Sequence, residues 1–183
     1  MKKGLVFILF FILSFSVFPQ SKEGNTSKIE IGLEFEKYPV GIIPTITSNV
    51  FLKKDVALRF RVGGNFADRG KTEFNDSETA KGYGASAGVV KYFRVGNGAI
   101  TIGFLTDFWC MKTNWTDGTF KGTTTNLVVQ PWISTGFLYR FSSDFNSGII
   151  VGFGREINTF NKGEEVGQGY MGSISLQMNY KLN

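Results

Sequence analysis

Histidine is absent from this 183-residue chain, and cysteine occurs once, at Cys110. Without imidazole groups, histidine-based catalytic triads and imidazole metal centres are excluded. A single cysteine forms no intramolecular disulfide, so an exported chain must be stabilised by other means. Catalysis by carboxylates or by a Ser-Lys pair stays formally open, but no constellation of residues favours it. We therefore expect no cofactor, no metal site and no enzymatic activity.

A long hydrophobic run is also absent after the first residues. Lys2 and Lys3 precede an apolar run, residues 5–18, which stops before Pro19. This run is shorter than the about 20 residues that a membrane-spanning helix needs. The pattern predicts a secretory signal peptide over residues 1–21 and a single domain over residues 22–183.

Strong charge of one sign is likewise missing. The formal net charge is +5, and it falls to +3 once Lys2 and Lys3 are removed with the leader. This charge is too small to indicate nucleic-acid binding. In contrast, 23 glycines, 15% aromatic residues and only four prolines suit many strands joined by turns.

Apolar and polar residues alternate with period two in eight segments, which predicts eight strands. Most of them have about 10 residues or more, which matches the length that crosses a bilayer at a tilt and exceeds the common globular strand. The predicted strands lie near residues 28–37, 42–52, 56–66, 82–94, 99–110, 124–141, 145–157 and 168–182.

The connections alternate between two kinds. Tight turns are expected at residues 53–55, 95–98 and 142–144. The other connections are a short one at 38–41 and long polar loops at 67–81, 111–123 and 158–167. Short turns at one end and long loops at the other are typical of barrels that cross the bacterial outer membrane.

Each predicted strand has an apolar face and a polar face. Eight strands enclose room only for side chains or one small ligand, so the bulky apolar rows would crowd the interior of a soluble barrel. We therefore expect the apolar face to contact lipid and the small, polar face to line the interior. Pro131 predicts a bulge or a ladder break, and the facing of strand 82–94 stays open because its parity is mixed. A soluble lipid-binding barrel is the alternative.

The charged residues that the alternation directs into the interior are the one group of residues that suggests a mechanism. Because buried ions must pair, we expect a fixed plug of salt bridges, with a gate that opens a narrow ion path by partner exchange as the alternative. The candidate residues are Glu30, Glu34, Glu36, Arg59, Arg61, Asp107, Arg140, Glu156 and Lys181.

Two glycine-containing motifs carry little weight. The stretch 63–72 nearly spells a phosphate-binding loop, but Asn65 stands where the first glycine is required and no helix pattern follows. The stretch 82–87 matches a dinucleotide-binding pattern, yet it opens a strand. Small residues inside a narrow barrel explain it better.

The leader, the eight alternating segments, the tight turns and a last amphipathic strand that ends in Tyr180 and Leu182 resemble the small outer-membrane barrels of the OmpA and OmpX kind. The resemblance implies an all-β, eight-stranded antiparallel transmembrane up-and-down β-barrel in the outer membrane of a Gram-negative-type bacterium. It also implies a monomer that contacts outer-membrane lipid and is inserted by the barrel-insertion machinery.

Two classes of function fit this expectation. The first is a surface protein, non-enzymatic, that contributes to envelope integrity or presents the loops 67–81, 111–123 and 158–167 to an external ligand. The second is a narrow pore or transporter for ions or small apolar solutes.

Overall fold

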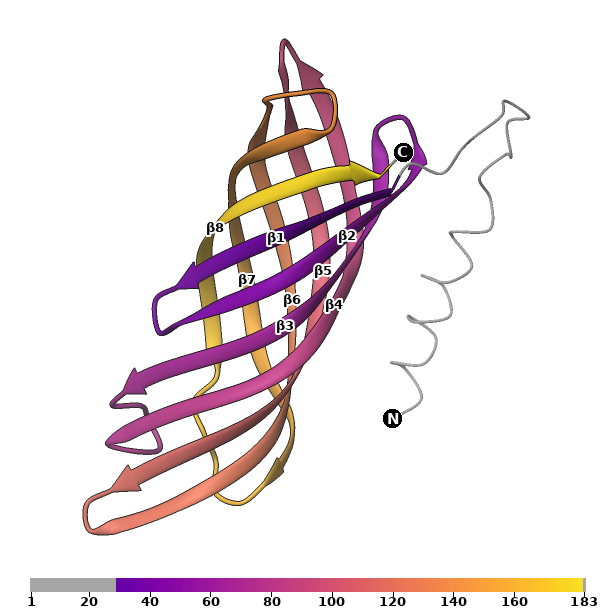
Figure 1. Ribbon diagram of the computed structural model, residues 1–183. Helices are drawn as coiled ribbons and strands as arrows, with labels where there is room; N and C mark the ends of the chain where they lie inside the picture. Colours follow the sequence, from indigo (N-terminus) through magenta and orange to yellow (C-terminus); the bar gives the residue numbers. More distant parts are fainter. Residues whose placement is uncertain (1–28, 183) are drawn as a thin grey trace.

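The computed structural model describes residues 29–182, which form a closed antiparallel barrel of eight strands in sequence order (Figure 1). The predicted signal peptide, residues 1–21, lies outside the described residues. No helix within the described part is long and apolar enough to span a membrane. The strands are β1 (Ile29–Tyr38), β2 (Gly41–Lys53), β3 (Val56–Gly70), β4 (Ser77–Val95), β5 (Gly98–Asp117), β6 (Phe120–Arg140), β7 (Phe145–Lys162) and β8 (Gly169–Leu182).

The two ends of the barrel differ. We call one end the terminal end, because it holds the start of β1 and the end of β8. The turns 54–55, 96–97 and 141–144 also lie there. We call the other end the loop end. It holds the connections 39–40, 71–76, 118–119 and 163–168. The β5–β6 hairpin projects furthest at the loop end, as Figure 1 shows.

The barrel closes because β1 also pairs with β8, from Ile29↔Leu182 to Lys37↔Ile174. Each strand therefore bonds to a neighbour on both sides through most of the wall. In hydrocarbon a strand has no water to satisfy its backbone, so closure is a condition for spanning a membrane.

Side chains on the outer and inner faces confirm the predicted orientation. Ile133 of β6 is 59% exposed, whereas the adjacent Trp132 and Ser134 are buried. The same contrast holds on every strand, with large apolar side chains outside. One from each strand in chain order is Leu33, Ile46, Phe60, Phe93, Phe104, Ile133, Val151 and Leu176. We call this outer surface the apolar belt.

The facing of β4, which the sequence left open, is settled by burial. Ser86 and Val90 are buried inside, while Tyr83 and Phe93 are exposed outside. Alanine and glycine occupy much of both faces between them, so the sequence contrast between the faces is weak in this strand.

The interior is layered along the barrel axis. One apolar cluster near the loop end includes Trp109 and Met111, and another near the terminal end includes Leu105 and Trp132. Charged and amide side chains lie between them. The indoles need small residues beside them, since a Cβ at Gly152 would lie 2.6 Å from the Trp132 ring.

The strands are longer than predicted at the loop end, so the expected long loops are wrong. Residues 111–123 form a continuous hairpin whose turn is Gly118 and Thr119, and the other two loops shrink to 71–76 and 163–168. Gly118 has a φ of +55°, which the first position of a tight hairpin turn requires. Beyond the belt the outward positions are polar, as at Lys112 and Asn114, so the regular apolar outer face that marks the other strands is missing there.

Pro131 interrupts the ladder on one side only. It pairs with Thr106 of β5, but the β6–β7 ladder skips from Val129↔Ile157 to Trp132↔Gly154. The register shift itself lies nearby, between Leu127 and Val128. The expected ladder break is therefore present at the proline, and the bulge is displaced from it.

A charge placed on the belt is expected to destabilise the barrel in lipid. Ile133→Arg, folded into phospholipid vesicles, should lower the free energy of unfolding by about 2–4 kcal/mol because lipid offers no partner. Thr123→Arg is the control, since Thr123 faces outward on the same strand beyond the belt. Denaturant titration measures both, and an equal loss in the two variants would contradict the assigned belt.

Candidate functional site

The centre of the interior is Arg61, whose guanidinium contacts three carboxylates from two strands. Its Nη1 lies 2.8 Å from Glu34 Oε1 and 2.9 Å from Glu36 Oε2, and its Nη2 lies 2.8 Å from Asp107 Oδ2. All four side chains are buried. Charge-assisted bonds of this length are stronger than neutral ones, so Arg61 joins β3 to β1 and to β5 across the lumen.

Trp132 of β6 completes this centre from the opposite wall. Its ring lies 4.8 Å from the Arg61 guanidinium carbon, and its Nε1 donates a hydrogen bond of 3.0 Å to Asp107 Oδ1. Asp107 therefore accepts from a cation and from an indole, which fixes its orientation. Side chains from four strands meet at this level.

Arg59 forms the adjoining part of the same layer. Its Nε donates to Asn49 Oδ1 at 2.9 Å, and its Nη2 donates to Gln177 Oε1 at 3.0 Å. Its Nη1 lies 3.9 Å from Glu34 Oε2. Because Gln177 belongs to β8, Arg59 extends the network across the β1–β8 seam.

These contacts bring together five of the candidate residues named from the sequence, at one level of the barrel. We call them the central layer: Glu34, Glu36, Arg59, Arg61 and Asp107.

A second network lies at the loop end around Arg69. Arg69 pairs with Glu156, and its Nη1 lies 3.8 Å from Glu78 Oε2. Glu156 was named from the sequence as a lumen charge, and the structure places it here, away from Arg61. Arg69 and Glu78 were missed because they fell in the predicted loop 67–81. For Arg69 the available signal was the inward parity of Asn65 and Ala67, which continues to residue 69.

Glu78 also holds two loops in place. It accepts hydrogen bonds from the Gly167 backbone N–H at 3.0 Å, from Thr72 Oγ1 at 2.8 Å and from Asn75 Nδ2 at 2.9 Å. Asn75 in turn donates to the Glu165 carbonyl. A single buried carboxylate therefore anchors residues 71–76 and 163–168 over the loop end.

The remaining three named residues, Glu30, Arg140 and Lys181, line a cavity of about 400 Å³ at the terminal end. Glu30 and Lys181 are cross-strand neighbours, but no salt bridge joins any of the three among residues 29–182. They are therefore not part of the central layer.

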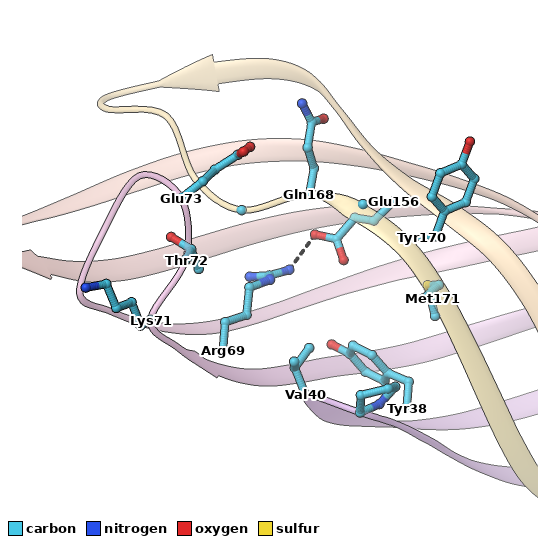
Figure 2. A pocket seen from close by; sticks show the side chains of 13 residues that line it. Tyr38, Val40, Arg69, Lys71, Thr72, Glu73, Glu156, Gln168, Tyr170 and Met171 are labelled. Atoms are coloured by element: carbon cyan, nitrogen blue, oxygen red, sulfur yellow. Dashed lines mark hydrogen bonds and ion pairs between the residues drawn. The ribbon is translucent and has the colours of Figure 1, made fainter.

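A pocket of about 410 Å³ opens at the loop end beside Arg69. Figure 2 shows Arg69 directed at Glu156, with Tyr38 and Val40 below them. The β1–β8 ladder ends at Lys37↔Ile174, so Met171 lines the pocket where the wall has no pairing between these strands. The pocket therefore places apolar surface beside a charged pair.

No family model matches the sequence, and no curated protein matches it either. Solved structures do match over most of the chain. The protein has the fold of the small eight-stranded outer-membrane β-barrels. This outer-membrane barrel fold is the one that the sequence predicted.

Three structures illustrate the likeness to this fold. Neisserial surface protein A is 17% identical with a TM-score of 0.54, covering 87% of this chain and 100% of that one. A major outer membrane protein from Thermus thermophilus is 11% identical, with a TM-score of 0.57 and coverages of 86% and 100%. Ail of Yersinia pestis is 12% identical, with a TM-score of 0.51 and coverages of 85% and 97%.

Removal of the central cation should destabilise the barrel strongly. Arg61→Met leaves buried carboxylates without their partner, and we expect a loss of about 3–5 kcal/mol in the free energy of unfolding. Neutralising Glu34, Glu36 and Asp107 to their amides in the same chain should recover part of it. Arg140→Met, at an exposed position, should change stability by no more than about 0.5 kcal/mol. A loss no larger in Arg61→Met than in Arg140→Met would contradict the role of the layer.

Loss of the loop anchor should act locally. Glu78→Ala leaves the Gly167 N–H without its acceptor and removes one of two acceptors from both Thr72 and Asn75, so local opening should become easier by about 1–3 kcal/mol. Amide hydrogen exchange of residues 71–76 and 163–168 measures this opening. Glu73→Ala, at an exposed position in the first loop, is the control and should leave exchange unchanged. Equal exchange in both variants would exclude the anchoring role.

Proposed function

We propose that this protein is an integral outer-membrane barrel without enzymatic activity, closed to ions, that serves the envelope as a structural or surface-binding protein. The single observation that carries the proposal is the combination of an outer apolar belt with a salt-bridged central layer. The apolar belt favours a lipid environment around the barrel, and the central layer closes its interior.

The apolar belt indicates that the outer face of the barrel is not surrounded by water. Large apolar side chains are exposed on all eight strands, among them Ile46 at 60% and Phe153 at 57%. Soluble monomers rarely expose contiguous apolar patches above a few hundred Å². Strands of 10 to 21 residues are also long enough to cross a bilayer. These two features together support the membrane location.

The interior argues against steady conduction. The central layer spans the lumen from β1 and β3 to β5, Trp132 of β6 contacts it, and one apolar cluster lies toward each end of the barrel. An interior of eight strands is commonly filled by side chains. A path for hydrated ions through this barrel would need Arg61 to leave its partners.

Export and placement complete the proposal. Residues 1–21 act as the signal peptide, and β8, which ends in Tyr180 and Leu182, is the segment offered to the barrel-insertion machinery. The protein is a monomer of the outer membrane in a Gram-negative-type bacterium, with its loop end outside. The fold supports this placement, since the structures it resembles are outer-membrane proteins.

The loop end is the part that meets external partners. Glu78 and Arg69 hold the loops 71–76 and 163–168 in fixed positions, which gives the pocket of Tyr38 and Met171 a defined shape. A ligand there would combine an apolar part with a charged or hydrogen-bonding part. Ail, a barrel of the same fold, has been solved with the heparin analogue sucrose octasulfate, so external ligands are known for this architecture.

Single-channel recording in planar bilayers tests the closed interior. The wild type should show no conductance above background, because the paired side chains of the central layer lie across the lumen. Arg61→Ala should leak through the gap it creates, and Arg140→Ala, outside the layer, should stay silent. Reproducible discrete openings in the wild type would contradict the proposal.

A narrow pore is the second candidate, and the terminal-end cavity is the observation that favours it. Glu30 and Tyr92 line this cavity, and each has a buried oxygen without a hydrogen-bond partner among the described residues, as has Glu34 in the central layer. Water entering from the terminal end would satisfy these atoms and reach Arg61. A gate at Arg61 predicts rare, salt-dependent openings whose frequency shifts in Glu34→Gln.

A further inference from the structure

A row of lysines crosses the outer face of four neighbouring strands beyond the belt. Lys81 of β4 lies directly opposite Lys112 of β5, Lys112 lies opposite Thr125 of β6, and Thr125 lies opposite Lys162 of β7. All four side chains are exposed. We call these residues the lysine row.

The height of the lysine row is fixed by its neighbours on the same strands. The next outward row toward the terminal end runs Tyr83↔Cys110↔Leu127 and on to Phe160. Tyr83 is 74% exposed and Phe160 is 61% exposed. Two residues along a strand span about 7 Å, so on β4 to β7 the lysines sit one step beyond this apolar row, and Lys81 also lies opposite the exposed Phe66 of β3. This is the level of lipid headgroups if the belt lies in hydrocarbon.

In the described part of the chain, no acidic side chain forms a salt bridge with a lysine of the row. Like charges directly opposite each other on a sheet are destabilising. No salt bridge involves Lys81, Lys112 or Lys162 among residues 29–182, whereas Lys91 pairs with Asp55 and Lys71 with Asp76.

The outward positions beside the row are uncharged as well: Thr79, Asn114, Thr116 and Thr123. Asp68 is the nearest outward acid on the adjoining strand, and it lies opposite Thr79. Glu164 and Glu165 follow Lys162 in the connection 163–168, and neither forms a salt bridge with the row. Within residues 29–182 the row is therefore a cationic surface without an ion-pair partner.

We propose that the lysine row binds the phosphate groups of an anionic lipid in the leaflet at the loop end, an inference that rests on the proposed membrane location. Each ammonium group offers three donors to phosphate oxygens, and the Thr125 hydroxyl between Lys112 and Lys162 offers another. Tyr83 and Phe160 lie where the acyl chains of the same lipid begin. Phosphate between Lys81 and Lys112 offsets their repulsion, which explains why two lysines are paired there.

The test uses the full barrel folded into neutral phosphatidylcholine nanodiscs, titrated with bisphosphorylated lipid A. Native mass spectrometry counts bound lipid, and lipid A stripped of its phosphates serves as the matched ligand. We expect the wild type to prefer the phosphorylated lipid and Lys81→Gln/Lys112→Gln to bind it about 10- to 30-fold more weakly. The control, Lys71→Gln/Lys121→Gln, removes the same charge from exposed positions outside the row and should bind like the wild type.

Three results would overturn the proposal. Equal binding by the two double variants would show that the row is not the site. Equal binding of phosphorylated and stripped lipid would show that phosphate is not recognised. Inorganic phosphate that abolishes lipid A binding at equal molar concentration would point to a free anion as the ligand. Failure of the wild type to fold into neutral nanodiscs would instead contradict the proposed membrane location. A barrel that folds but does not bind lipid A contradicts only the lysine row as a site, so the two failures can be distinguished.

Discussion

Closure of the backbone ladder between β1 and β8 is the constraint on which the rest of the structure depends. Once eight strands form a ring, the interior is narrow and every inward side chain meets its counterparts from the opposite wall. Bulky indoles such as Trp132 then need glycine beside them, and Gly152 provides it. The two interior clusters around Trp109 and Trp132 take up the room for apolar side chains inside, so the other large apolar residues occupy the outside. The belt is therefore a consequence of ring size as well as a surface suited to lipid.

The same narrow ring makes the buried charges obligatory partners. A lone ion at this depth would be costly, yet Arg61 with Glu34, Glu36 and Asp107 forms a compact group in which each charge has an opposite at hydrogen-bond distance. These contacts link strands that are not neighbours in the ladder, so they brace the ring across its diameter. Rigidity at the centre and anchored loops at one end suit a protein that presents a fixed surface.

The sequence predicted the fold class, the number of strands and the outward direction of the apolar face, because lipid contact imposes strict alternation. It failed at residues 111–123, where the outward positions are polar instead of apolar and a regular apolar outer face no longer marks a strand, although the dipeptide Asp117-Gly118 was an available hairpin signal. Parity also gave the inward direction of Glu156 but not its height along the barrel. The height of a side chain depends on the register between strands. That register places Glu156 beside Arg69 and away from Arg61.

Spin-label accessibility along β5 tests the central claim most directly, since this strand runs through the belt and beyond it. With Cys110 replaced by Ala, single labels at residues 100–116 in phospholipid vesicles report collisions with oxygen, which concentrates in hydrocarbon, and with a water-soluble nickel chelate. We predict high oxygen contact at Ile102 and Phe104, low contact with both agents at Thr101 and Gly103, and high nickel contact at Asn114. Strong nickel contact at Phe104, or oxygen contact without period two, would contradict the account.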